Sequence, residues 1–162
     1  MIFTILIFSF YLEGILSRLV DISFLIPLTT LLSLILIYPY LYDSKRNYYI
    51  ICFITGLIYD IVYTNTLFLN SFIFLLIGYL ISLLNIIITN NSLNVIIISL
   101  IIITIYRITT YLILVFVDYL NFNILDLFNS IIYSIILNII YISIMYKITD
   151  LISKKIGIYK KD

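Results

Sequence analysis

The chain has 162 residues, of which 64% are hydrophobic and only 10% are charged, and its formal net charge is +1. A soluble domain usually carries about 25% charged residues, so this composition excludes a soluble globular protein and indicates a polytopic membrane protein. With no histidine, the sequence has no His-based catalytic triad, His metal site or haem ligand. The lone Cys52 allows no internal disulfide, and we expect no cofactor.

Six apolar windows are long enough to be membrane-spanning helices, which need about 20 apolar residues each. Because the backbone in lipid has to satisfy its own hydrogen bonds, and the windows lack the alternation of barrel strands, we predict helices. Pro27 is expected in the first turns of the second helix, where a missing N–H costs least. The predicted helices span residues 2–17, 22–40, 48–64, 67–89, 95–117 and 127–146. They form one six-helix membrane domain, residues 1–147, followed by a basic tail, residues 148–162.

The positive charges predict the orientation of the chain, because lysine and arginine mark the cytoplasmic side. Only Arg18 lies in a connection after an odd-numbered helix. The cations after even-numbered helices are Lys45, Arg46, Lys147, Lys154, Lys155, Lys160 and Lys161. Both termini are therefore expected in the cytoplasm. We interpret the tail as an anchor on anionic membrane lipid, with a docking segment for a cytoplasmic protein as the alternative; nucleic-acid binding has no support beyond the lysines.

The third predicted helix contains a carboxylate, Asp60, which costs about 2.5 kcal/mol or more at the centre of a membrane helix. Gly56, Tyr59, Asp60, Tyr63 and Thr64 recur at i, i+3, i+4, i+7 and i+8, so they share one helix face. Apolar residues occupy the opposite face, which is expected to meet lipid. The polar face has two open uses: contact with the helix of another chain, or packing within its own bundle.

Two further charges, Glu13 and Arg107, lie in the first and fifth predicted helices. All three charged residues are expected at the middle or in the outer half of the membrane. Arg107 is therefore predicted to pair with Glu13 or Asp60, or to bridge both, and a role in binding a partner or substrate stays open beside this pairing. The small and polar residues along other helices, among them Gly78, are interpreted as helix-packing contacts.

Enzymatic functions find little support in the sequence. It has no glycine-rich phosphate loop and no cluster of aspartates of the kind that holds magnesium. An aspartyl-type intramembrane hydrolase would have only Glu13 and Asp60, which lie on different helices without flanking catalytic glycines. We therefore expect a protein that is not an enzyme.

One segment resembles a known family. The pattern G-x-x-Y-D-x-x-Y-T at 56–64, followed by Leu67 and by F-L-L-I-G-Y-L at 74–80, resembles the rod shape-determining protein MreD family. The early pair Glu13-Gly14, the length and the six predicted helices also agree with that family. The chain departs from the family in the turn after Thr64, where a glycine is common and this sequence has L-F-L at 67–69.

The resemblance implies a non-enzymatic scaffold of the cell-elongation machinery in the bacterial plasma membrane. Its direct partner would be the MreC protein, whose body lies outside the membrane. Together they would couple peptidoglycan synthesis outside to MreB filaments inside, with cell-wall synthases as further partners. The resemblance also implies a fold similar to the substrate-binding subunits of energy-coupling-factor vitamin transporters.

Two alternatives stay open. A vitamin-transporter subunit would need a polar pocket open to the outside and small-residue motifs on the first helix, which is rich in Ile, Phe and Leu here. An enzyme or flippase for lipid-linked wall precursors would need a cationic or metal site for pyrophosphate, and Arg107 is the one intramembrane cation that the sequence offers for it.

Overall fold

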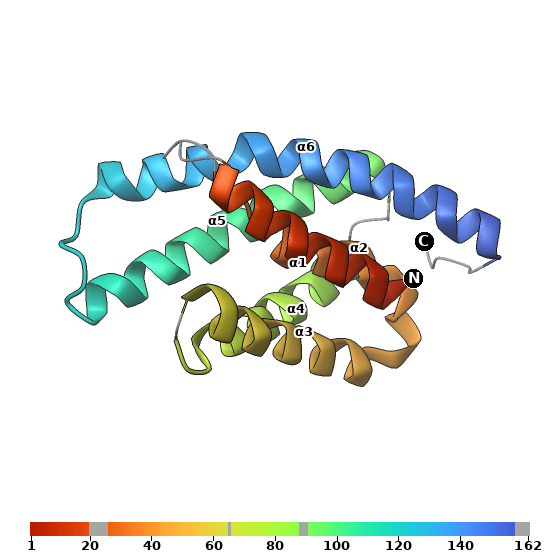
Figure 1. The fold of residues 1–162 in the computed structure, drawn as a ribbon, viewed down its shortest axis with the longest axis horizontal. Helices are drawn as coiled ribbons and strands as arrows, with labels where there is room; N and C mark the ends of the chain where they lie inside the picture. The colour runs from red at the N-terminus through yellow and green to blue at the C-terminus, as the bar shows by residue number, and fades with distance from the viewer. Residues whose placement is uncertain (20–25, 65, 88–90, 158–162) are drawn as a thin grey trace.

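A computed structural model describes residues 1–19, 26–64, 66–87 and 91–157. In this part of the chain every regular element is helical, which confirms the all-helical prediction. Six α-helices follow one another in these described segments (Figure 1). Their bounds are α1 (Ile2–Leu19), α2 (Thr29–Ile37), α3 (Lys45–Tyr59), α4 (Leu69–Ile87), α5 (Ser92–Phe116) and α6 (Ile124–Ile156).

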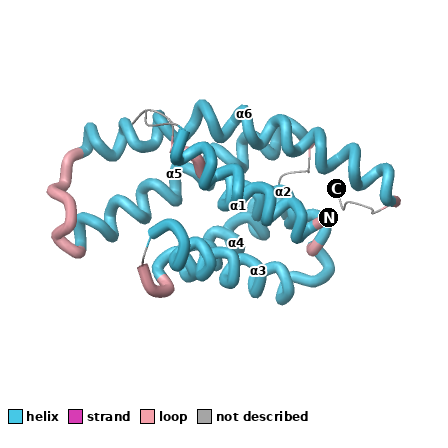
Figure 2. The backbone as a smooth tube through the Cα atoms, in the orientation of Figure 1, coloured by secondary structure: helices cyan, strands magenta, loops and turns pink. Residues whose placement is uncertain are grey.

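Short helical segments extend two of these helices. A 3-10 turn, η1 (Tyr38–Tyr40), continues α2 at Pro39, and a second, η2 (Tyr42–Ser44), leads into α3. A π-helix, η3 (Asp60–Thr64), continues α3 and contains the second half of the glycine–aspartate pattern. The described connections that remain are brief, as the pink segments of Figure 2 show.

The bundle is built from two long antiparallel hairpins, α3–α4 and α5–α6, with α1 and α2 between them (Figure 1). Every residue of α2 is buried, so this short helix forms the centre of the core. The start of α1, the start of α3 and the end of α6 lie at one end of the molecule, which we call the terminal end. The α3–α4 and α5–α6 turns lie at the other, which we call the turn end.

Among the described residues, four stretches are long and apolar enough to cross a membrane. They are Tyr42–Thr64, Leu69–Ile87, Ser92–Phe116 and Ile124–Lys155, and a shorter apolar stretch, Thr29–Tyr40, lies among them. Large apolar side chains also cover much of the outer surface, among them Phe3, Phe72, Leu76 and Ile140. Because water would not tolerate such a surface but lipid does, the chain is a multi-pass membrane protein, as its composition predicts.

The second helix differs from its prediction. Residues 22–25 of the predicted helix lie outside the described part, and residues 26–28 are not helical, so Pro27 precedes α2 instead of occupying its first turns. Asn138 of α6 explains the late start, because its Oδ1 accepts from Leu28 N at 2.8 Å and its Nδ2 donates to Ile26 O at 2.9 Å. The proline itself also disfavours helical backbone at the residue before it.

The sixth helix is longer than predicted. The side chain of Asn123 accepts a hydrogen bond from Leu125 N and caps its start, and Gly157, in the left-handed conformation at φ 73°, ends it. The first part of the predicted tail is therefore helical through Ile156, since no helix-breaking residue lies between Tyr146 and Gly157. The rest of that tail, residues 158–162, lies outside the described part.

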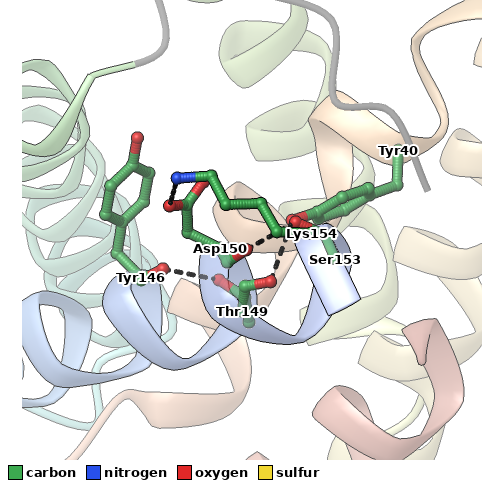
Figure 3. A network of polar contacts seen from close by, with 6 residues as sticks. All are labelled: Tyr40, Tyr146, Thr149, Asp150, Ser153 and Lys154. Atoms are coloured by element: carbon green, nitrogen blue, oxygen red, sulfur yellow. Dashed lines mark hydrogen bonds and ion pairs between the residues drawn. The ribbon is translucent and has the colours of Figure 1, made fainter. Parts of the chain in front are cut away.

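Contacts at the terminal end join α6 to the extension of α2 (Figure 3). Tyr40 Oη donates to the carbonyl oxygen of Thr149 at 3.4 Å, and Lys154 pairs with Asp150 at 2.7 Å one turn further along α6. Lys45 begins α3 at this same end. The sequence assigns the lysines and arginines that follow even-numbered helices to the cytoplasmic side. Those among the described residues lie together at the terminal end.

Candidate functional site

Asp60 lies at the junction of α3 and η3, where its side chain faces the first turn of α4. Its Oδ1 accepts from the backbone N and side-chain Nδ2 of Asn70, at 3.0 and 2.9 Å, and from the hydroxyl of Thr66. Its Oδ2 accepts from the backbone N and hydroxyl of Ser71, at 3.0 and 3.1 Å. Because the first N–H groups of a helix have no partner within it and face its positive dipole end, Asp60 acts as the N-terminal cap of α4.

Gly56 lies one helical turn before Asp60 and lets the two helices meet. A Cβ at this position would lie 2.5 Å from Asn70 O and 2.6 Å from Ser71 Cα, distances that leave no room for any side chain. The backbones of α3 and α4 therefore touch where Asp60 reaches across. The spacing of glycine and aspartate in the sequence pattern thus serves one junction: the glycine allows the approach and the carboxylate caps the helix.

The π-helix η3 places the last two residues of the pattern. Thr64 Oγ1 lies 3.3 Å from Asp60 Oδ1 and 2.7 Å from the hydroxyl of Thr66, so the threonines extend the cap. Tyr63 points the other way, and its Oη donates to the carbonyl oxygen of Phe10 in α1 at 2.6 Å. π-Helical turns often occur at functional sites, and this one sends adjacent residues to two different helices.

Glu13 of α1 repeats this arrangement at the start of α2. Its Oε2 accepts from Thr30 N at 2.7 Å and lies 3.4 Å from the hydroxyl of Thr29, while its Oε1 accepts from Tyr59 Oη at 2.8 Å. The side chain is only 2% exposed. Each of the two intramembrane acids thus caps the helix that follows its own in the chain. Tyr59 joins the two junctions, because it neighbours Asp60 in α3 and binds Glu13.

Arg107 of α5 does not form the predicted ion pair. Its Nε donates to Ser134 Oγ of α6 at 2.6 Å, and its Nη2 is buried without a hydrogen-bond partner. Among the described residues, no carboxylate lies within ion-pair distance of it. The predicted pairing with Glu13 or Asp60 is therefore wrong. The physical reason is that both carboxylates are already engaged by the N–H and hydroxyl groups of helix starts.

Gly78 of α4 lies apart from these junctions, in the middle of the α3–α4 contact. A Cβ there would lie 2.6 Å from Cys52 Sγ and 3.5 Å from the ring of Tyr48, so the glycine makes room for two α3 side chains.

The sequence did not predict which residues donate hydrogen bonds to the two carboxylates. They are Thr30, Asn70 and Ser71. A signal was present for one of the helix starts. Asn70-Ser71 follows the turn residues and precedes a long apolar run, and such polar residues mark helix starts. Nothing in the sequence indicates that Glu13 reaches Thr30, because that contact depends on how α1 and α2 pack.

A wide groove lies between α1 and α3 on the membrane-facing surface, with a volume of about 850 Å³. Its walls are apolar apart from Asn47 and Thr55 and are formed by the sides of the two helices. Those of α1 are Ile2, Phe3, Leu6, Ile7, Phe10 and Tyr11, and those of α3 and its flanks are Leu41, Asn47, Ile50, Ile51, Ile54, Thr55, Ile58 and Val62. Towards the turn end the helices are joined by Tyr59 and Tyr63, which bind Glu13 and Phe10 O.

The two buried carboxylates are engaged in contacts between helices. In the described part of the chain, no three His, Cys, Asp or Glu residues gather to hold a metal ion. Both buried carboxylates are occupied by helix starts, so neither faces an open pocket as a general acid or base would. What the arrangement offers another molecule is the groove and the exposed apolar surface around it.

The family model described as MreD, rod shape-determining protein, matches residues 1–156, which is nearly the whole chain. This match implies a role in rod shape determination within a family of structural membrane proteins. No curated protein and no solved structure matches the chain.

Proposed function

The chain belongs to the MreD family of rod shape-determining proteins, and from this premise we propose that it is a non-enzymatic membrane scaffold that binds MreC in the groove between α1 and α3. The groove is the observation that supports this proposal. Through MreC the protein would connect cell-wall synthases outside the membrane to MreB filaments inside.

The scaffold requires a defined orientation in the bacterial plasma membrane. We propose that all six helices lie in the bilayer with both termini in the cytoplasm. Support comes from Lys45, Arg46, Lys147, Lys154 and Lys155, which lie at the terminal end. The four long stretches supply four spans. The remaining two helices are α1 and α2. Every residue of α2 is buried, so this short helix needs no contact of its own with lipid. The likeness in fold to energy-coupling-factor substrate-binding subunits stays a prediction.

A groove of this kind suits a single transmembrane helix of a partner. Two splayed helices with apolar stripes form a trough into which a third helix can lay one of its faces. Within lipid, such association depends on close packing and a few hydrogen bonds instead of hydrophobic burial. Asn47, in the first turn of α3, and Thr55, about two turns further along the same wall, offer those hydrogen bonds. A bitopic partner such as MreC supplies one such helix.

In this arrangement MreC contacts the groove side of α3, and the glycine–aspartate face of the same helix is not part of the contact. The glycine–aspartate face packs against α4 and α1, and Asp60 is only 1% exposed, so it has no surface left for a partner. Ile54 and Ile58, on the free side of α3, are 50% and 43% exposed. The residues of the family pattern therefore hold α3 against α4 and α1, and they do not line the groove themselves.

The test is co-purification of MreC with the tagged protein from its own cells in mild detergent. Ile54→Trp fills the groove with a bulky apolar side chain that lipid tolerates. We expect MreC recovery to fall about tenfold or more, equivalent to about 1.4 kcal/mol of lost affinity. The matched control is Leu76→Trp, at a lipid-facing position of α4 that is 58% exposed, and it should recover MreC as the wild type does.

Two results would count against the proposal in different ways. Equal recovery of MreC by wild type and Ile54→Trp would mean that the groove is not the contact. Failure of the wild type to recover MreC at all, with the protein correctly inserted, would remove the scaffold function itself.

A further inference from the structure

Arg107 is the one intramembrane charge whose role the helix junctions do not explain. Its guanidinium carries five N–H donors, and its only hydrogen bond to a described residue runs from Nε to Ser134 Oγ. Nη2 is buried and has no partner. A cation in this state within a membrane protein requires an anion, and the described part of the chain supplies none within ion-pair distance.

The free part of the guanidinium has a defined chemistry. Ser134 is itself held in place, because its hydroxyl donates to Ser130 O at 2.8 Å while it accepts from Arg107. With Nε bound, the two terminal amino groups remain as a planar fork. Such a fork binds the oxygens of a phosphate or carboxylate with two parallel hydrogen bonds.

The level of Arg107 in the membrane distinguishes the sources of that anion. The neighbouring Tyr106 donates from its Oη to Asn70 Oδ1 at 3.0 Å, and Asn70 lies in the first turn of α4. The 19 residues of α4 span about 28 Å, the thickness of the hydrocarbon core. The start of α4 therefore lies at the boundary of that core, and Arg107 lies close to the same level, where lipid headgroups begin.

The α5–α6 hairpin extends further at the turn end than the α3–α4 hairpin (Figure 1). From Arg107, α5 continues for nine more residues to Phe116 before the chain turns into α6. On the membrane side of Arg107, α5 exposes apolar surface for acyl chains, with Ile97 47% exposed.

We propose that Arg107 binds the phosphate of a phospholipid headgroup in the leaflet at the turn end, which is the outer leaflet in the proposed orientation. Ser134 positions the guanidinium by holding Nε, and exposed apolar residues of α5 on the membrane side of Arg107, such as Ile97, contact the acyl chains. The lipid would neutralise the cation.

Native mass spectrometry of the purified full chain in mild detergent tests this site, with phosphatidylglycerol as the probe. We expect one tightly held phosphatidylglycerol on the wild type and about tenfold weaker binding for Arg107→Met. Arg18→Met, which removes an exposed arginine from α1, should bind as the wild type does. A diacylglycerol with the same acyl chains lacks the phosphate, so wild type and Arg107→Met should bind it equally.

Further outcomes keep the proposal open to refutation. Equal phosphatidylglycerol binding by wild type and Arg107→Met would overturn it, and so would complete displacement of the lipid by millimolar inorganic phosphate, which would identify a soluble anion as the ligand. Should Arg107→Met not fold, Arg107→Lys keeps the charge but loses the fork, and weaker binding than the wild type is expected. Because MreC is absent from this experiment, its failure leaves the scaffold proposal untouched.

Discussion

Asp60→Leu tests whether this carboxylate caps α4. The substitution removes the acceptor of two backbone N–H groups, those of Asn70 and Ser71, both of which are buried. Each buried donor left without a partner costs about 1–3 kcal/mol, and the lost favourable interaction with the helix dipole adds up to about 1 kcal/mol. Since leucine itself is tolerated in lipid, which offsets part of this cost, we expect a net loss of about 3–5 kcal/mol in the free energy of unfolding.

The assay is unfolding of the purified protein in mixed micelles by sodium dodecyl sulfate, followed by far-ultraviolet circular dichroism. Asp60→Asn provides a graded comparison, because its carbonyl oxygen can replace one carboxylate oxygen but its amide cannot accept a hydrogen bond; about half of the loss is expected. Asp126→Leu is the matched control, since Asp126 lies exposed in the first turn of α6. If Asp60→Leu lowers the unfolding free energy no more than Asp126→Leu does, the carboxylate is not the cap that the geometry indicates.

Four further substitutions test the helix contacts in the same unfolding assay. Gly56→Ala places a methyl group against the α4 backbone and should cost about 2–3 kcal/mol. Gly78→Ala meets the side chains of Cys52 and Tyr48 instead of backbone and should cost less, about 1–2 kcal/mol; reversal of this order would contradict the close-approach argument. Glu13→Leu leaves Thr30 N unbonded and should cost about 2–4 kcal/mol, and a neutral effect would refute its capping role. Tyr63→Phe loses one hydrogen bond to α1 and should cost about 1 kcal/mol, with unchanged stability as the opposing result.

The association assay adds a distinction between direct and indirect effects on MreC. If Asp60 acts only through the α3–α4 junction, Asp60→Leu should reduce MreC recovery in proportion to the loss of folded protein. Ile54→Trp should reduce recovery while the unfolding free energy stays near that of the wild type. A large loss of MreC with Asp60→Leu at full stability would instead indicate that the acid contacts the partner directly.

The sequence by itself determined the class of the protein. Its apolar composition and the length of its apolar windows depend on the bilayer alone, and so they predicted a helical membrane protein without knowledge of packing. The periodicity of Gly56, Tyr59, Asp60, Tyr63 and Thr64 likewise predicted a shared helix face, because helical geometry is local. The same local pattern supported the family resemblance, and the family match confirmed it.

Only the tertiary structure decided what the charged residues do. The sequence offered one cation and two acids at similar depth, and simple electrostatics favoured pairing them. The fold instead starts α2 and α4 against Glu13 and Asp60, and the unsatisfied N–H groups of those helix starts engage the carboxylates first. Arg107 is left with Ser134. Which of these competing partners wins depends on where each helix begins within the bundle, a property of packing that no local pattern contains.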